Sequence, residues 1–98
     1  MYENLKPRHT SILKVINLRG ENVILEDHTR YPLGESNLYC VTESGEMVWV
    51  AERPAPDAHY IRVKLEDDGN RLSAYTTGRH ACELDVRTGK LLSQIEFK

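Results

Sequence analysis

Four histidines and two cysteines are the side chains of this chain that could bind a transition-metal ion. His80 and Cys82 are two residues apart in an apolar segment, so on a β-strand both side chains would face the same side. Cys40 or His59 could supply a further ligand. However, the sequence has no Cys-x-x-Cys or His-x-x-x-His pair, and a structural zinc site needs four converging ligands. We expect Cys82 to be a small buried residue beside a surface histidine, with no metal or cofactor.

No spacing in the chain indicates catalysis. The nucleophile-elbow pattern Gly-x-Ser-x-Gly and the glycine-rich phosphate loops are absent from the sequence. Glu66, Asp67 and Asp68 precede Gly69 and Asn70, and this order is typical of a solvated hairpin tip. Carboxylates that catalyse as a pair need an enclosed cleft. We therefore predict that the protein is not an enzyme, and a hydrolase with an unfamiliar site is retained as a third hypothesis.

Tyr60 and the three carboxylates form the candidate interaction site. Tyr60 begins a segment in which apolar and polar residues alternate, and we expect its side chain on the exposed face of a strand. Tyrosine is enriched in binding hot spots. Glu66, Asp67 and Asp68 would attract a basic partner such as a toxin. Trp49, which lies between two valines, is expected in the core.

The composition narrows the classes of partner. The chain has 98 residues, enough for one small domain, and its formal net charge is −2. It therefore lacks the basic surface typical of nucleic-acid-binding proteins. No apolar run approaches the ~18 residues that a membrane span needs, and the N-terminal residues lack the order of a signal peptide. We expect a cytoplasmic protein with neither a nucleic-acid nor a membrane partner.

Eight apolar segments alternate with polar turns along the chain. β-Branched and aromatic residues are common in them and no stretch has a sustained 3.6-residue period, so we expect β-strands and no long α-helix. Residues 53–58, RPAPDA, contain two prolines, which disfavour strand and helix alike and indicate a linker. The expected strands are residues 10–18, 23–26, 37–42, 46–52, 59–66, 71–76, 79–85 and 90–97.

The two halves on either side of the linker share one pattern. Residues 10–52 and 59–97 each contain four expected strands, with polar turns at matching places. Gly45 of the first half aligns with Gly89 of the second. Two copies of a four-stranded meander, each about 45 residues long, are in the size range of propeller blades. The pattern predicts an internal pseudo-repeat.

The aligned turns have a physical cause. Asp85 is expected to accept hydrogen bonds from backbone N–H groups of the turn that follows it. Gly89 is expected to adopt a left-handed conformation, which suits glycine best. We interpret both as structural turn residues, with Thr42 near the position of Asp85 in the first half.

The same alignment bears on the cysteines. It places Cys40 opposite Glu83, and Cys82 opposite Tyr39. Because successive residues of a strand face opposite sides of the sheet, we expect the two thiols to face opposite sides of their sheets and to form no disulfide.

Two segments resemble a known repeat. LDVRTGKLLSQ has the Asp-x-x-Thr-Gly-Lys order, followed by two apolar residues, of the blades in propellers of the pyrroloquinoline-quinone-dehydrogenase type, and LYCVTESGEMVW is similar to it. The resemblance covers residues 37–50 and 81–94. Trp49 lies where those blades carry a tryptophan, whereas Thr42 replaces the aspartate in the first copy and Ser93 the tryptophan in the second. The resemblance implies a blade-like fold, and a quinone cofactor does not follow from it.

A second resemblance concerns the whole chain. The residues that carry it are Asn37, Tyr39, Cys40, Trp49, Pro54, Pro56, Asp85, Thr88, Gly89, Lys90, Phe97 and Lys98. In these residues the chain resembles a group of short bacterial proteins without an assigned activity. Some small bacterial proteins of this sort act as immunity proteins to secreted toxins, so the resemblance implies a toxin as one class of partner.

These patterns together predict one all-β domain over residues 1–98, with about eight antiparallel strands in two blade-like four-stranded meanders. Two blades cannot close a propeller ring, so we expect a sandwich, an incomplete propeller or a homodimer. The leading hypothesis for function is a non-enzymatic protein-binding module, specifically an immunity-type protein that binds a toxin. The alternative is a small-ligand or metal-binding module, with its ligand in the crevice between the two sheets near His80 and Cys82.

Overall fold

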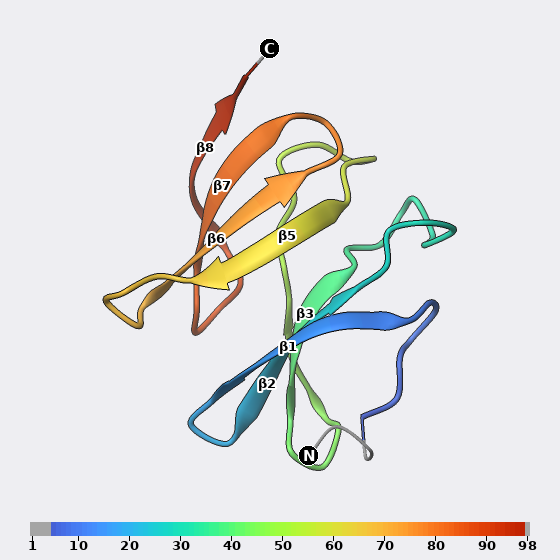
Figure 1. The fold of residues 1–98 in the computed structure, drawn as a ribbon, viewed down its shortest axis with the longest axis vertical. Helices are drawn as coiled ribbons and strands as arrows, with labels where there is room; N and C mark the ends of the chain where they lie inside the picture. The colour runs from blue at the N-terminus through green and yellow to red at the C-terminus, as the bar shows by residue number, and fades with distance from the viewer. Residues whose placement is uncertain (1–4, 98) are drawn as a thin grey trace.

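Eight β-strands form the regular structure of the computed structural model, which describes residues 5–97 (Figure 1). The strands form two four-stranded antiparallel sheets, which confirms the all-β class and the two meanders predicted from the sequence. No helix in the described residues is long and apolar enough to cross a membrane. The strands are β1 (Ile12–Leu18), β2 (Glu21–Glu26), β3 (Leu38–Thr42), β4 (Met47–Val50), β5 (Tyr60–Leu65), β6 (Arg71–Thr76), β7 (His80–Asp85) and β8 (Leu91–Glu96).

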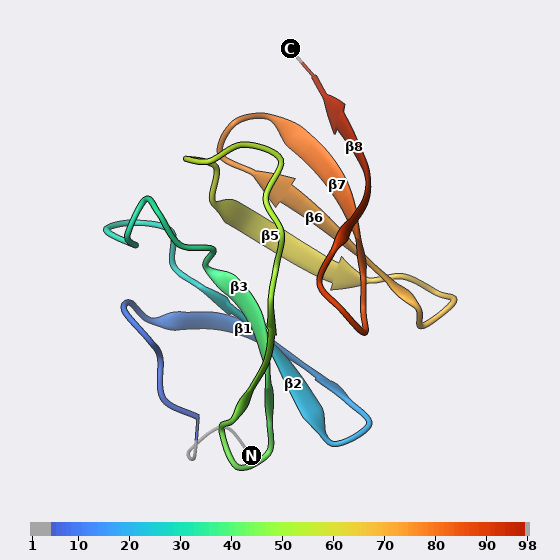
Figure 2. The ribbon, with the colours of Figure 1, turned by 180° about the vertical axis from the view of Figure 1, so that it is seen from behind.

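Each sheet is a simple meander, in which strands adjacent in sequence are hydrogen-bonded neighbours. The first sheet has the order β1-β2-β3-β4 and the second has the order β5-β6-β7-β8. Figures 1 and 2 show the sheets as two separate halves of the molecule, with the end of β8 extending away from the rest. The expected linker at 53–58 lies in the irregular connection between β4 and β5.

One apolar core lies between the two sheets. Val23 and Leu25 of β2 and Leu72 and Ala74 of β6 are buried in it, because alternate residues of a strand point to the same face of the sheet. Trp49 is 6% exposed and belongs to the same core, as predicted. Because both sheets contribute to this core, each half of the chain covers the apolar face of the other.

The cysteines show how the sheets face each other. Cys40 and Cys82 are both buried in the shared core and are free thiols. When the two meanders are aligned, the two thiols lie on opposite faces of their sheets. Both still point into the same core, because the inner face of one sheet packs against the face of the other sheet that corresponds to its outer face. Cys40 points into the core whereas its aligned residue Glu83 points out, and Cys82 points in whereas its aligned residue Tyr39 belongs to a second cluster on the other face. Opposite faces of the two meanders therefore meet in one core.

Asn37 joins the two sheets through buried polar contacts. Its side-chain amide donates hydrogen bonds to the carbonyl oxygens of Glu26 (2.8 Å) and Tyr60 (2.7 Å). Its side-chain oxygen accepts one from the N–H of Tyr60 (2.8 Å). Asn37 is fully buried, so these bonds satisfy backbone groups at the start of β5 that water cannot reach.

The turns at Gly45 and Gly89 are similar, and the first is one residue shorter than the second. The Gly45 N–H donates to the carbonyl of Thr42 (2.9 Å), and the Gly89 N–H donates to the carbonyl of Asp85 (2.8 Å). Both glycines have a positive φ, +94° and +73°. The Asp85 carboxylate accepts a hydrogen bond from the N–H of Arg87 at 2.8 Å. Asp85 and Gly89 thus shape the turn between β7 and β8.

Gly89 also makes a contact between the sheets. A β-carbon at this position would lie 2.4 Å from Cε3 of Trp49, so only glycine lets the turn rest on the indole ring. The indole N–H of Trp49 donates to the carbonyl of Val86 (3.1 Å), and the N–H of Glu52 donates to the carbonyl of Gly89 (2.8 Å). The turn of the second half is therefore fitted to the last strand of the first.

The N-terminal residues cover the outer face of the first sheet. Ile24, Tyr39 and Val41 are buried there, with Leu5, Ile12 and Val15 packed against them. This second cluster buries β2 and most of β3 on both faces, whereas Met47 and Val50 of β4 remain exposed.

Candidate functional site

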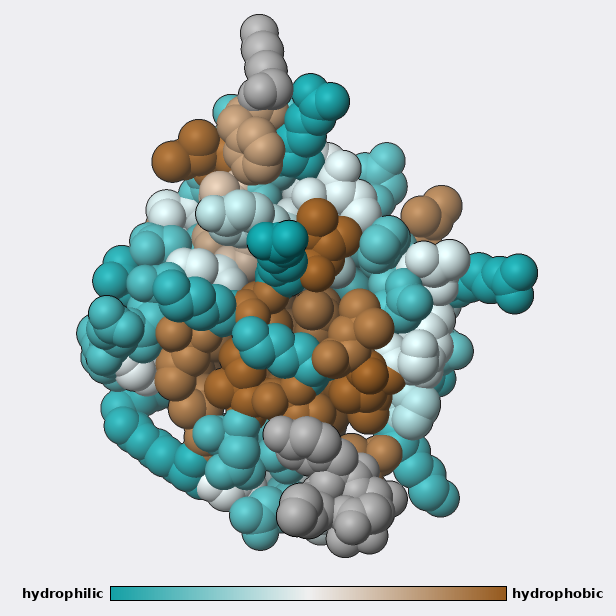
Figure 3. All heavy atoms as spheres, viewed as in Figure 1, coloured by the Kyte–Doolittle hydropathy of each residue, from teal (hydrophilic) through white to brown (hydrophobic). Residues whose placement is uncertain are grey.

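A groove of about 540 Å³ lies where β1 of the first sheet approaches β5 of the second. Lys14 spans it, because its ammonium group donates a hydrogen bond to the carbonyl of Val63 at 2.8 Å. The buried side chain of Leu25 forms part of its wall. Figure 3 shows an apolar area over the middle of this face, interrupted by hydrophilic side chains.

Two β-bulges supply the exposed apolar side chains of the groove. Leu13 is an extra residue in the pairing of β1 with β2, and Ile61 is an extra residue in the pairing of β5 with β6. A bulged residue departs from strict alternation and can turn a side chain outward. Leu13 is 55% exposed and Ile61 38% exposed, and both line the groove together with Tyr75, which is 46% exposed.

The charge of the groove is mainly positive. Lys14, Arg62 and Lys64 line it, whereas Glu66 is the one carboxylate among the described residues of its lining. The Glu66 carboxylate accepts a hydrogen bond from the hydroxyl of Ser73. Within residues 5–97, neither Arg62 nor Lys64 forms an ion pair. Exposed apolar groups beside such cations fit an acidic protein segment that also has apolar side chains.

The three carboxylates of the candidate interaction site lie at the β5–β6 hairpin, as expected. Asp67 and Asp68 are exposed, and Glu66 is half-buried at the base. A hydrogen bond from the N–H of Asn70 and a contact with Arg71 (2.9 Å) hold the pKa of Asp68 below its usual value. Asp68 is thus partly neutralised by its own hairpin.

Tyr60 is not on the exposed face, so this expectation is wrong. Its side chain is 1% exposed and lies in the core between the sheets. The cause is the bulge at Ile61, which reverses the alternation of β5 so that Tyr60 and Val63 both point inward. The Tyr60 hydroxyl donates to the carbonyl of Glu52, and burial above all raises its pKa.

The residues considered for metal binding are not brought together. Among residues 5–97, no group of three or more His, Cys, Asp or Glu side chains is arranged to hold a metal ion. His80 faces the same side of β7 as Cys82, but its Nδ1 lies 2.9 Å from the hydroxyl of Thr76. Burial raises the pKa of Cys82, and burial followed by the nearby Glu21 raises the pKa of Cys40 to about 12. Both thiols are therefore protonated near neutral pH.

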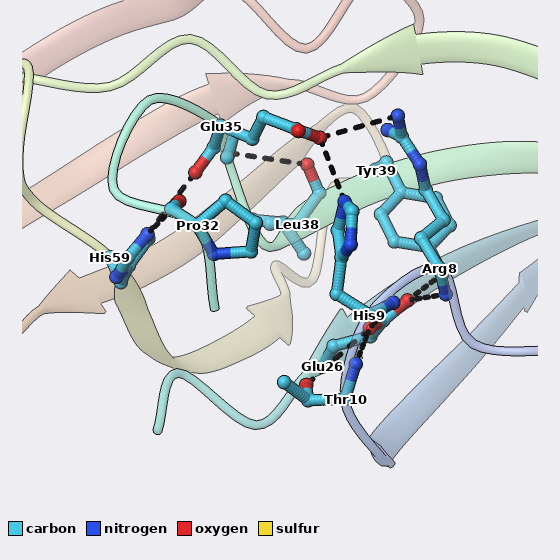
Figure 4. A network of polar contacts seen from close by, with 10 residues as sticks. Arg8, His9, Thr10, Glu26, Pro32, Glu35, Leu38, Tyr39 and His59 are labelled. Carbon is cyan, nitrogen blue, oxygen red and sulfur yellow. Dashed lines mark hydrogen bonds and ion pairs between the residues drawn. The ribbon is translucent and has the colours of Figure 1, made fainter. Parts of the chain in front are cut away.

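His59 has a structural partner set of its own. Its Nε2 lies 3.0 Å from the carbonyl oxygen of Pro32 and 3.1 Å from that of Glu35 (Figure 4). Because carbonyl oxygens only accept, this nitrogen carries the proton. His59 thus anchors the loop between β2 and β3 to the start of β5.

The sequence did not point to Glu26, the most enclosed charged group. Its carboxylate is fully buried and accepts hydrogen bonds from the N–H groups of Arg8 (2.6 Å), His9 (3.1 Å) and Thr10 (2.9 Å) (Figure 4). The hydroxyl of Tyr39 donates to it as well. This arrangement fixes residues 8–10 to the first sheet, and it offers no open position for a substrate. The one indication in the sequence is that a charged residue, Glu26, ends the otherwise apolar segment VILE at 23–26.

No protein-family model matches the chain, and no curated protein is significantly similar to it.

Proposed function

We propose that this chain is a non-enzymatic protein-binding domain and that the groove between β1 and β5 is its binding surface. The proposal rests on one observation, the combination of two kinds of side chain around one open cavity. Exposed apolar side chains line it, namely Leu13, Ile61 and Tyr75. Beside them are the cations of Arg62 and Lys64, which form no ion pair with a carboxylate of residues 5–97. Buried apolar anchors supply affinity in protein interfaces, and charges around them supply orientation and association rate.

The partner that fits this groove is an acidic protein segment with apolar side chains. The candidate surface thereby moves from the acidic hairpin tip to the basic groove at its base, since the carboxylates of Asp68 and Glu66 are already engaged within the hairpin. The resemblance to small bacterial proteins supports a secreted toxin as the source of that segment, and an immunity role in the bacterial cytoplasm. Two free buried thiols agree with a reducing compartment.

Selection from a peptide library tests this proposal. The purified chain is used to select from a library of random linear peptides, and the same is done with the double variant Arg62→Glu/Lys64→Glu. The wild-type chain should enrich peptides that combine Asp or Glu with apolar residues, and the double variant should lose that enrichment. Arg87→Glu/Lys90→Glu is the matched control, because it changes the net charge equally at exposed residues outside the groove.

Two results would contradict the proposal. One is enrichment of basic peptides by the wild-type chain, which would return the binding surface to the acidic hairpin tip. The other is an equal loss of binding in the groove variant and the control variant, which would show that only net charge matters.

A further inference from the structure

The open edge of β8 lacks the protection that the three other edge strands have. β1 and β5 carry a bulge and lysines on their edges, and β4 is only four residues long. Charges, bulges and shortness are the devices by which proteins prevent edge-to-edge pairing. β8 has a bulge at Leu92, in the same place as the bulges of β1 and β5, but it lacks their basic residues: from Ser93 to Phe97 the sequence has one charged residue, Glu96, and no proline.

The backbone of this segment has free hydrogen-bonding groups. The N–H of Phe97 donates to the carbonyl of Arg79 at 2.9 Å, toward the neighbouring strand β7. Since N–H and C=O groups of an edge strand point alternately to its two sides, those of Gln94 and Glu96 point to the open edge. Within residues 5–97, the outer edge of β8 is covered only at its start, where the Glu52 carboxylate accepts the N–H of Leu91.

The side chains of the same segment form an exposed apolar surface. Leu92 is 52% exposed, Ile95 67% and Phe97 44%. Ile95 pairs with Ala81, which pairs with Tyr75, so one apolar row crosses the outer face of the second sheet. Phe97 packs edge-on against Tyr75, with ring centroids 6.3 Å apart.

We propose that the open edge of β8 binds β8 of a second copy of this chain, antiparallel and with the two-fold axis at Ile95. The two Ile95 side chains then contact each other on the outer face. Gln94 of each copy lies opposite Glu96 of the other, and these residues exchange backbone hydrogen bonds through the groups that point to the edge. The two second sheets become one eight-stranded sheet.

The pattern of the strand favours a second copy over an unrelated partner. About this axis, Ile95 meets Ile95 of the other copy, and Phe97 lies opposite Ser93 and diagonal to that Ile95. The carboxylate of Glu96 meets the amide of Gln94, which can donate to it. No like charges of the described residues are directly opposite. Two-fold axes nearer the start of the strand would displace Glu52 from Leu91. The pairing leaves the groove open, because β5 is at the opposite edge of the sheet.

Sedimentation equilibrium tests the dimer. The wild-type chain should show a concentration-dependent monomer–dimer equilibrium. Ile95→Lys should weaken dimerisation at least about tenfold, since it places like charges opposite each other and removes an apolar contact. Leu33→Lys is the control, because Leu33 is also 67% exposed but lies in the loop between β2 and β3. A wild-type chain that stays monomeric, or a dimer that Ile95→Lys leaves intact, would overturn the proposal.

Cysteine cross-linking tests the position of the axis. Two Ile95→Cys residues would be opposite each other at a Cα separation of about 4.5 Å, within the range of a disulfide, whereas two Ser93→Cys residues would be about 13 Å apart. Oxidation with diamide, a thiol oxidant, should give a covalent dimer of Ile95→Cys and no covalent dimer of Ser93→Cys. The reverse result would exclude this register.

Discussion

Gly89 is the residue on which the local turn and the packing of the two halves both depend. Its φ of +73° favours glycine, and Trp49 fills the space where a β-carbon would be. Gly45 in the aligned turn has the same kind of backbone, with φ +94°, but apart from its neighbours in the chain no described residue has an atom within 4 Å of the position that a β-carbon would take. Comparing Gly45 with Gly89 therefore separates the effect of backbone conformation on stability from the effect of side-chain packing.

Gly89→Ala should therefore destabilise the protein more than Gly45→Ala. A left-handed alanine costs about 1 kcal/mol at either site. At Gly89 the overlap with the Trp49 ring adds about 1–3 kcal/mol of overpacking. Urea unfolding of both variants measures the difference in the free energy of unfolding. Equal losses would show that the indole ring moves away without cost.

Glu26 makes the free energy of unfolding depend on pH in the acid range. Burial raises the pKa of this carboxyl, but hydrogen bonds from the Tyr39 hydroxyl and from the N–H groups of Arg8, Thr10 and His9 outweigh it, so its pKa lies below the ordinary value of 4.5. The unfolded chain then binds a proton at higher pH than the folded chain does. The stabilisation is complete above about pH 4.5 and is lost as the pH falls through the folded pKa.

The free energy of unfolding should thus fall as the pH is lowered below about 4.5, and Glu26→Gln should make that fall shallower. At neutral pH the same variant should lose about 1–3 kcal/mol, because buried donors lose their charged acceptor. Urea unfolding between about pH 3 and pH 7 provides the measurement. Glu43→Gln is the control, since Glu43 is exposed and its carboxylate forms no hydrogen bond or ion pair within residues 5–97. A Glu26→Gln profile parallel to that of the wild type would contradict the role of this carboxylate.

At the scale of the elements, the β-bulges decide which side chains are exposed. Ile61 is the extra residue of β5, and it lets Tyr60 and Val63 both point into the core. Deleting Ile61 should destabilise the fold far more than Ile61→Ala. The deletion forces one residue of the pair out of the core or shifts the strand register, whereas the alanine variant loses only half-exposed contacts. Thermal unfolding compares the two, and similar melting temperatures would contradict this role of the bulge.

The positions of the strands could be predicted from the sequence, whereas the positions of the bulges could not. The eight strands lie within or close to segments expected from β-branched runs and glycine-containing turns, because those signals are local. The bulges at Leu13 and Ile61 have no such signal, since a bulge is defined by pairing with another strand. For this reason the strict alternation of β5 predicts an exposed Tyr60, whereas its side chain is buried. Glu26 was missed for a similar reason: its partners at residues 8–10 come together only in the folded chain.

The groove could not be found in the sequence either. Lys14 and Val63 are 49 residues apart and are joined only because the second sheet packs against the first. The alternation of Arg62 and Lys64 in β5 was visible, but nothing nearby in the sequence showed that Leu13 of the other half would lie beside them. In general, a surface formed by two sheets from distant parts of a chain cannot be recognised from either part of the sequence alone.

At the scale of the molecule, the two meanders stack front to back, and this arrangement leaves two different outer faces. Residues 5–10 lie over the part of the outer face of the first sheet around Ile24 and Glu26, while the outer face of the second sheet carries polar side chains and the apolar row that ends at Ile95. The groove lies where the sheets meet at β1 and β5. Its position between the halves means that it exists only when both have folded.

The most direct test of the proposed groove is an amide map of the whole chain. A ¹H–¹⁵N correlation spectrum is recorded while an acidic, apolar peptide from the library selection is added. We expect the shift changes to gather at β1 and β5, around Leu13, Lys14 and residues 61–64, and to be absent in Arg62→Glu/Lys64→Glu. Shift changes confined to the hairpin tip at residues 66–70 or to the outer edge of β8 would contradict the assignment of the groove as the binding surface.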